Sequence, residues 1–251
     1  MGRIGAATGR TDAPARSPAG PPRGVRAVLL DALGTLVELQ PPVPPLRAEL
    51  AARGVKIDDA EAGAALRAEI THYRAHHLEG SDRAGVARLR RRCAEEMRAA
   101  LPDRVRDALP LGELEAAMIA ALRFEPYPDT AAALEDLRRR GLRLVVVSNW
   151  DVSLHDQLAR DGIGRLVHGI VSSAELGAAK PAPAAFAQAL TLAGVPAEQA
   201  VHVGDRVEED VQGARGAGIT PVLVVRGGEP PVLDDPVWTI RSLRELAALG
   251  P

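Results

Sequence analysis

Acidic, hydroxyl and amine side chains follow four apolar segments of this chain. Asp31 follows the first segment, Ser148 the second and Asp205 the fourth, with Asp210 five residues further on. Lys180 lies in the loop after the third segment. Carboxylates that lie close together repel one another and are costly to bury unless a cation joins them. If these side chains converge, a hard divalent cation such as Mg²⁺ would neutralise them and would also accept phosphate oxygens of a ligand.

Each of these residues, taken alone, is better explained by a local structural role. A strand-end Asp or Ser is more often a turn former or a helix N-cap than a reactive group. In open α/β sheets, however, reactive groups lie just beyond the carboxyl ends of the strands. A shared site is therefore favoured by the four positions together and by none of them singly.

The apolar segments have the length and composition of buried parallel strands. The first runs from Val25 to Leu30 and stops at Asp31, and Gly34 and Thr35 then require a turn. Further strands are predicted at 142–147, 168–173, 200–203 and 220–225, and core helices at 129–140, 208–215 and 242–249. Strands that alternate with helices predict an α/β fold, with a Rossmann-like parallel sheet of five or more strands and helices on both faces.

The chain is predicted to divide into a leader, a two-part core and an inserted helical cap. Residues 1–24 are rich in Pro, Gly, Ala and Arg without periodicity, which is typical of disorder. The core comprises 25–40 and 126–251, and the block at 41–125 shows helical periodicity without a convincing strand. Helices are predicted in that block at 45–53, 59–78, 83–100 and 111–122.

Composition and charge give no sign of a nucleic-acid or membrane partner. A formal net charge of −2 over 251 residues gives no reason to expect a nucleic acid or an anionic membrane as a partner. No apolar run approaches the ~20 residues of a membrane helix, and no signal-peptide core is present. The single cysteine, Cys93, excludes an intrachain disulfide and fits a reducing compartment. We therefore expect a cytoplasmic protein, as a monomer or homodimer.

The order and spacing of the motifs resemble the haloacid dehalogenase-like hydrolase superfamily. The motifs read Asp31-Ala-Leu-Gly-Thr35, Ser148-Asn149, Lys180-Pro181 and Gly204-Asp205 followed by Asp210. The resemblance extends over about 25–245, and the block at 41–125 is similar to the cap of the family's first capped subfamily. The run at 140–151 is similar to the animal "haloacid dehalogenase-like hydrolase domain containing" proteins.

The resemblance implies a phosphatase of a small phosphorylated metabolite. Asp31 would be the nucleophile that attacks phosphorus and forms an aspartyl-phosphate. The Asp31 and Asp205 carboxylates and the carbonyl of Leu33 would bind Mg²⁺, and Asp210 would bind or orient water on the metal.

The remaining motif residues would serve the substrate. Ser148 and Asn149 would donate hydrogen bonds to phosphoryl oxygens, and Thr35 would lie beside the substrate. Lys180 would offset the charge of the nucleophile and of the phosphoryl group.

One position departs from the phosphatase pattern. Phosphatases of this superfamily usually have a second Asp two residues after the nucleophile, which protonates the leaving group. Leu33 occupies that position here and cannot transfer protons. General acid–base help is typically worth about 10²–10⁴ in rate, so we expect a slow phosphatase or a proton donor from the cap or the substrate.

The departure leaves two other hypotheses open. The 2-haloacid dehalogenases also lack that Asp, and their nucleophile attacks carbon without a metal. Their last motif differs, however, and the acidic run Glu208, Glu209 and Asp210 is unsuited to a metal-free anion site. A degenerate, non-catalytic member that binds a metal or a partner is the third hypothesis.

Overall fold

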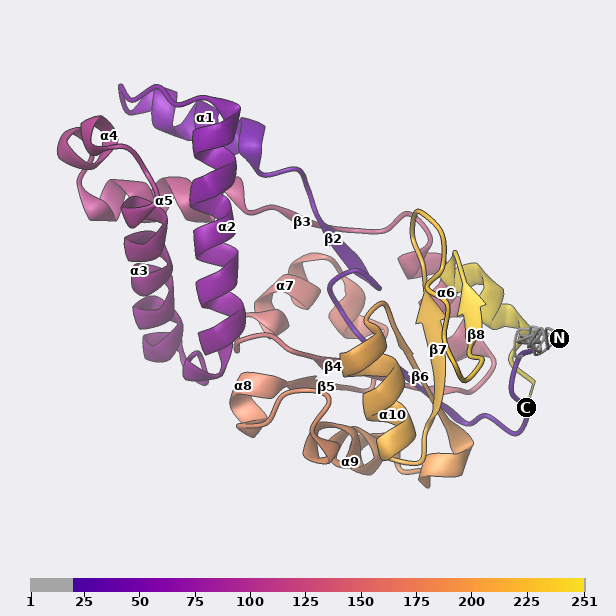
Figure 1. The fold of residues 1–251 in the computed structure, drawn as a ribbon. Helices are drawn as coiled ribbons and strands as arrows, with labels where there is room; N and C mark the ends of the chain where they lie inside the picture. The colour runs from indigo at the N-terminus through magenta and orange to yellow at the C-terminus, as the bar shows by residue number, and fades with distance from the viewer. Residues whose placement is uncertain (1–19, 251) are drawn as a thin grey trace, which may run out of the picture.

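Six parallel strands form the central sheet, in the order β5-β4-β1-β6-β7-β8 (Figure 1). The computed structural model describes residues 20–250, so most of the predicted leader at 1–24 lies outside the described residues. The strands are β1 (Ala27–Leu30), β4 (Arg143–Ser148), β5 (Gly169–Ser172), β6 (Ala200–Gly204), β7 (Thr220–Val224) and β8 (Trp238–Ile240). The predicted α/β fold is confirmed, and β8 is added to the five strands located in the sequence.

Strand β1 occupies the middle of the sheet because all four of its side chains are apolar and it is buried on both faces. It pairs with β4 on one side and β6 on the other, with Leu30 opposite Val146 and Val203. A hydrogen bond of 2.9 Å from Asp31 N to the Val203 carbonyl continues the ladder past the strand. The carboxyl ends of the three strands therefore meet at one edge of the sheet.

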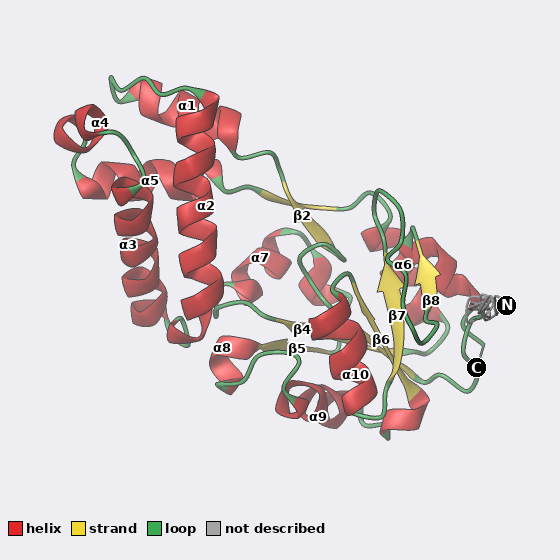
Figure 2. Cartoon of the chain, in the orientation of Figure 1, coloured by secondary structure: helices red, strands yellow, loops and turns green. Residues whose placement is uncertain are grey.

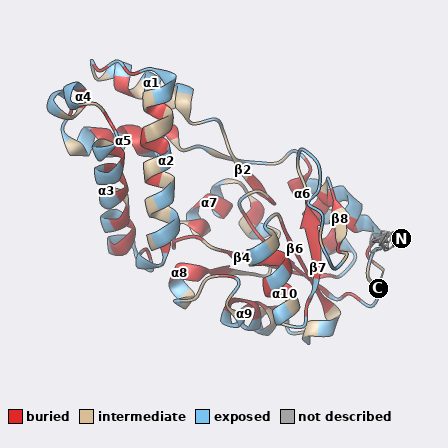
Figure 3. Cartoon of the chain, viewed as in Figure 1, coloured by how far each residue is buried: buried red, intermediate tan, exposed pale blue. Residues whose placement is uncertain are grey.

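Helices cover both faces of the sheet (Figure 2). Side chains such as Val28 pack against α6 (Thr130–Arg139) and α7 (Leu154–Arg160). The alternate positions, such as Leu29, pack against α9 (Pro183–Ala193) and α10 (Gly213–Gly216). The buried residues consequently run along the strands, while the outer faces of the helices are exposed (Figure 3).

Two predicted core helices have a different form. The segment predicted at 208–215 is a π-helical turn, Val207–Gln212, followed by α10. The helix predicted at 242–249 is a 3₁₀ helix, Leu243–Ala248. No helix among residues 20–250 combines the length and the apolar character needed to cross a membrane.

Helices α1–α5 form a second packed unit beside the sheet (Figure 1). They are α1 (Val43–Ala52), α2 (Asp59–His76), α3 (Arg83–Ala99), α4 (Asp103–Ala108) and α5 (Leu111–Ala121), and their apolar faces share a core of their own. A reciprocal pair of hydrogen bonds between Asp58 and Glu61 caps the start of α2. Helix α4 was not predicted, because its six residues are too few to show a period.

A short antiparallel ribbon carries the chain between the sheet and these helices. It consists of β2 (Val37–Leu39) and β3 (Phe124–Pro126). The expectation that 41–125 contains no strand is therefore wrong at its end, because β3 begins at Phe124. Three-residue strands show no usable alternation in a sequence, and the pairing that defines them is tertiary.

A largely buried ion pair links the segments that flank the ribbon to the C-terminal part of the chain. The Arg226 guanidinium donates to both Asp129 oxygens, at 2.7 and 2.9 Å, and to the Thr35 carbonyl. Asp129 also accepts from Ser242 Oγ at 2.7 Å and Leu243 N at 2.8 Å. Burial acts to raise the pKa of Asp129, but these donors outweigh it and hold that pKa below its ordinary value. The loop after β1, the start of α6 and the C-terminal segment are thus joined through the Arg226–Asp129 pair.

Asp129→Asn should lower the free energy of unfolding by about 2 kcal/mol at neutral pH, because the half-buried Arg226 loses its ionic partner. A carboxyl whose folded-state pKa is lowered stabilises the fold above its unfolded-state pKa of about 3.9. The loss of unfolding free energy in Asp129→Asn should therefore be complete above that pH. It should vanish as the pH falls through the lowered pKa of Asp129. Urea unfolding across this range measures it.

The matched control is Asp136→Asn, which removes a carboxylate from the same helix. Asp136 pairs with Arg139 at the surface, at 3.1 Å, and such pairs contribute between 0 and about 1 kcal/mol. Equal losses in the two variants would contradict a special contribution from Asp129.

Candidate active site

The predicted charged residues meet at the carboxyl edge of the sheet. Lys180 Nζ lies 2.7 Å from Asp31 Oδ1 and 2.6 Å from Asp210 Oδ1. Ser148, the last residue of β4, donates from Oγ to Asp31 Oδ1 at 3.2 Å. All four side chains are buried. The structure therefore brings these four together from separate segments of the chain.

Burial and charge determine the ionisation of this cluster. Burial, reinforced by Asp210 and Asp205, raises the pKa of Asp31 to about 7, although Lys180 opposes the shift. Burial acts to lower the pKa of Lys180, but its two carboxylate partners outweigh it and hold that pKa above the ordinary value. The cluster is thus short of positive charge, because one ammonium serves several carboxylates.

Asp210 uses both of its carboxylate oxygens inside the protein. Oδ1 accepts from Lys180 and from His202 Nε2, the latter at 2.9 Å, and Oδ2 accepts from Arg206 N at 2.9 Å. Burial alone would raise the pKa of Asp210, but Lys180 and His202 together hold it well below its usual range. The part expected of Asp210 in orienting water on a metal stays a prediction, and in this structure it holds Lys180.

Asn149 clamps the main chain of Lys180. Lys180 N donates to Asn149 Oδ1 at 2.7 Å, and Asn149 Nδ2 donates to the Lys180 carbonyl at 2.9 Å and to Glu209 Oε2 at 3.2 Å. The amide is therefore already occupied, and the role of Asn149 as a donor to phosphate stays a prediction. The contact of Glu209 with Asn149 and this clamp were not predicted from the sequence, where the pairing of Asn149 with a residue 31 positions away left no signal.

The loop after β1 passes close to Asp205. Gly34 has a φ of +88°, and a Cβ there would lie 2.4 Å from an Asp205 carboxylate oxygen, so glycine is required. Leu33 is 37% exposed, and the Thr35 side chain is fully buried. Among the described residues, none forms a hydrogen bond with Thr35 Oγ1. The roles of Leu33 and Thr35 toward a metal and a substrate remain predictions.

The donor set fits a hard metal ion. One carboxylate oxygen from each of Asp31, Asp205 and Asp210 lies within 4.8 Å of the others. Burial and then Asp210 raise the pKa of Asp205 to about 6, and Asp205 Oδ1 is buried with no hydrogen-bond partner among residues 20–250. Three carboxylates against one ammonium leave two negative charges, which a divalent cation would balance.

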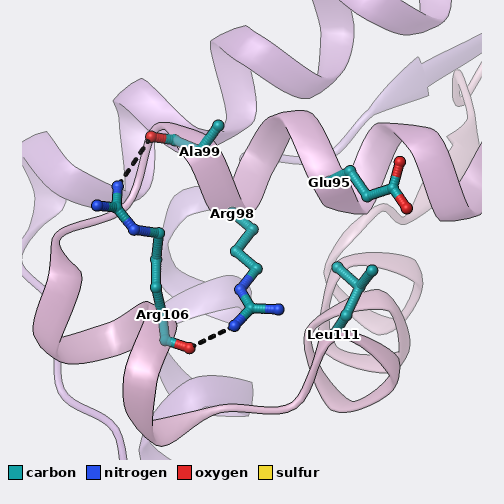
Figure 4. Close-up of a pocket in the computed structure, with 5 residues that line it drawn as sticks. All are labelled: Glu95, Arg98, Ala99, Arg106 and Leu111. Carbon is teal, nitrogen blue, oxygen red and sulfur yellow. Dashed lines mark hydrogen bonds between the residues drawn. The ribbon is translucent and has the colours of Figure 1, made fainter.

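A separate hollow lies away from these residues, among α3, α4 and α5 (Figure 4). Arg98 donates to the Arg106 carbonyl and Arg106 to that of Ala99, while Glu95 and Leu111 complete the lining. Both guanidinium groups are thus engaged with carbonyls of the same unit. No predicted site residue lines this hollow, which has no evident part in the chemistry.

The family model for haloacid dehalogenase-like hydrolases matches residues 25–218, most of the chain, and therefore includes every residue of the cluster. The chain belongs to the haloacid dehalogenase-like hydrolases. The cluster therefore lies in a protein of the hydrolase class, and the predicted resemblance is confirmed.

Two curated relatives match the chain over part of its length. A glyceraldehyde 3-phosphate phosphatase from Methanopyrus kandleri is 40% identical over 129 residues, 49% of this chain and 55% of that protein. The haloacid dehalogenase-like hydrolase domain-containing protein 3 of Danio rerio is 40% identical over 129 residues, 50% of this chain and 52% of that protein. The chain thus spans about half the length of the curated relatives it matches.

Solved structures of this family match nearly the whole chain. A phosphatase from Thermococcus onnurineus is 26% identical with a TM-score of 0.62, over 89% of this chain and 96% of that one. A 2-haloacid dehalogenase from Pseudomonas syringae pv. Tomato is 24% identical, also with a TM-score of 0.62 and with the same coverage, and this likeness shows the fold alone.

Asp205→Asn should raise the melting temperature of the metal-free protein at about pH 8, because it removes one of three repelling carboxylates. The folded-state pKa of Asp205 is raised to about 6, and the unfolded value is about 3.9. Wild type therefore loses stability as the pH rises between these values. The gain in the variant should be complete above about pH 6 and absent near pH 4, in thermal melts with a chelator.

Adding a divalent cation at about pH 8 should reverse the order. Wild type should gain stability by mass action, and Asp205→Asn should not. Glu208→Gln is the control, since it removes an exposed charge from the same turn and should leave both effects unchanged. A cation response that persists in Asp205→Asn would place the metal elsewhere.

Proposed function

We propose that this protein is a Mg²⁺-dependent phosphatase of small phosphorylated metabolites that works through an aspartyl-phosphate on Asp31. The observation that carries the proposal is the state of the Asp31 carboxylate. Lys180 and Ser148 hold Oδ1, whereas no described residue donates to Oδ2. One oxygen is thus anchored and the other is available, as a nucleophile requires.

The first chemical step forms a bond from Asp31 Oδ2 to phosphorus and breaks the bond from phosphorus to the ester oxygen. The leaving oxygen takes the electron pair and then a proton from solvent, because Leu33 supplies none. Lys180 and Ser148 would stabilise the negative charge on the phosphoryl group. Water then attacks phosphorus and loses a proton to solvent, and the bond from phosphorus to Asp31 Oδ2 breaks, which releases phosphate and regenerates the Asp31 carboxylate.

The metal would be held by the Asp31 and Asp205 carboxylates and the Leu33 carbonyl, with Asp210 behind them. Bound Mg²⁺ would supply Lewis-acid stabilisation of the phosphoryl charge. The acidic cluster and the orphaned Asp205 oxygen support a hard cation at this place.

Helices α1–α5 are proposed as the cap of this site, with the core at 25–40 and 126–251 and the cap at 41–125. Tyr73 of α2 donates from its hydroxyl to Asp151 Oδ2 at 3.0 Å, and Asp151 follows Ser148 closely in the chain. A cap helix thus contacts the loop that carries a phosphate-binding candidate. Cys93 is buried as a free thiol inside the cap, which supports the cytoplasm as the location.

A 2-haloacid dehalogenase is the second candidate, and the apolar Leu33 is the observation in its favour. The surroundings count against it, because Asp205, Asp210 and Glu209 would repel the carboxylate of a haloacid. A screen of phosphorylated metabolites with and without Mg²⁺, together with halide release from 2-chloropropionate, separates the two activities. Turnover in neither assay would favour a non-catalytic binding protein.

Asp31→Asn should abolish turnover of p-nitrophenyl phosphate, because an amide does not replace the carboxylate nucleophile. The change is nearly isosteric, so circular dichroism should show a folded protein. Asp234→Asn alters an exposed loop residue and should keep full activity. Phosphate release by Asp31→Asn at the wild-type rate would contradict this mechanism.

Leu33→Asp should raise the hydrolysis of alkyl phosphates, by at most about 10²–10⁴, because it restores a proton donor at the position where related phosphatases have one. The gain should be much smaller for p-nitrophenyl phosphate, whose leaving group scarcely needs a proton. Comparing kcat/KM for the two substrates in both proteins measures the difference. Leu33→Asn is the matched control, because the Asn side chain has the shape of Asp but cannot act as a general acid.

A folded, Mg²⁺-binding Leu33→Asp protein that gains nothing on alkyl phosphates would show that the missing acid is not what limits the rate. In that event the proton comes from another group, or phosphate ester hydrolysis is not the reaction.

A further inference from the structure

Strand β6 carries one polar side chain, His202, in the sequence Ala-Val-His-Val-Gly. His202 is fully buried and stands opposite Leu29 of β1. Because side chains alternate along a strand, His202 shares its face with Ala200 and Gly204. An imidazole in the middle of an apolar strand is costly unless its nitrogens are used.

The face that His202 shares with Gly204 holds the Asp210 carboxylate. A Cβ on Gly204 would lie 2.2 Å from Asp210 Cγ, so the missing side chain provides the space that the carboxyl fills. His202 Nε2 lies 2.9 Å from Asp210 Oδ1. The strand thus both makes room for Asp210 and supplies a hydrogen bond to it.

Phe186 of α9 holds the imidazole in place. The two rings meet edge to face, with centroids 5.1 Å apart and an interplanar angle of 87°. The Phe186 ring is itself confined, because a Cβ on Gly213 would lie 2.8 Å from it. With this packing, the direction of the Nε2–H bond is determined by the core and not by solvent.

The tautomer follows from the partner. An ionised carboxylate accepts hydrogen bonds and donates none, so Nε2 must carry the proton. Nδ1 is buried with no partner among the described residues, which is tolerable for a bare nitrogen but not for a stranded N–H. Burial also favours the uncharged ring, which leaves Nε2–H as the donor.

We propose that His202 is a positioning residue, whose Nε2–H fixes the Asp210 carboxylate and thereby keeps the Lys180 ammonium against Asp31. Asp210 Oδ1 accepts from both His202 and Lys180, so the two donors converge on one atom. Without His202, only Arg206 N would still hold the Asp210 carboxylate from the other side, and Oδ1 would be free to shift away from the position that anchors Lys180. The catalytic part of this inference rests on the proposed function.

Three substitutions separate the hydrogen bond from the shape of the ring. Gln places an amide N–H near the position of Nε2, Asn places one nearer the backbone, and Leu fills space without a donor. His202→Leu and His202→Asn should lower kcat on p-nitrophenyl phosphate roughly 10–100-fold with little change in KM, a loss typical of outer-shell partners. His202→Gln should keep most of the activity.

A second measurement requires no catalysis. In ¹⁵N NMR spectra of the metal-free protein, the Lys180 ammonium should give a signal protected from exchange, because it is buried between two carboxylates. The signal should be lost in His202→Leu and kept in His202→Gln. Val145→Ala is the control, since Val145 is buried on the same face of the sheet. It should lower the melting temperature and leave the ammonium signal and kcat unchanged.

The outcomes are decisive in both directions. Loss of signal and of kcat in His202→Leu, with both kept in His202→Gln, supports the inference. Equal losses in all three variants, an unchanged Lys180 signal in His202→Leu, or no protected signal in wild type would overturn it. A wild-type protein that releases no phosphate with Mg²⁺ refutes the proposed function, while the ammonium signal still decides the part played by His202.

Discussion

The Lys180 ammonium, held between Asp31 and Asp210, is the interaction on which the site depends. It is the one side-chain cation bonded to these two buried carboxylates in the described part of the chain, with contacts of 2.7 and 2.6 Å. Breaking a buried pair leaves an uncompensated charge, which is far more costly than losing a surface pair. The surrounding structure is accordingly arranged to hold the lysine from several directions. Asn149 forms a hydrogen bond with its main chain, and Asp210 accepts one from its side chain.

The parallel sheet makes this arrangement possible. Strands β1, β4 and β6 end at the same edge, so residues that are far apart in the chain become neighbours without any long loop having to place them. Rigid strands also leave little freedom in the positions of Asp31 and Ser148. A charged site built in this way is organised before a ligand arrives, and less reorganisation is then required during the reaction.

The parts of this architecture that follow from local pattern were predictable. Long apolar runs located five strands, and the polar residues at their ends or in the segments that follow them indicated Asp31, Ser148, Lys180, Asp205 and Asp210. The pairing of side chains was not predictable, because it depends on register and on which face of a strand a residue occupies. His202 lies on the face that meets Asp210, and the neighbouring Val203 on the other. Elements of three residues, such as β2, β3 and β8, were missed because tertiary pairing defines them.

The ribbon of β2 and β3 has a consequence for how the chain can fold. Residues 31–142 separate β1 from its partner β4, and closing so long a loop is entropically unfavourable. The ribbon joins the two ends of the helical unit, which has its own apolar core. Once that unit has formed and the ribbon has closed, the effective loop between Leu30 and Arg143 contains only the residues on the sheet side. The remaining closure between β1 and β4 then costs little more entropy than that of a short loop, so a large helical unit is accommodated next to the central strand without a matching cost.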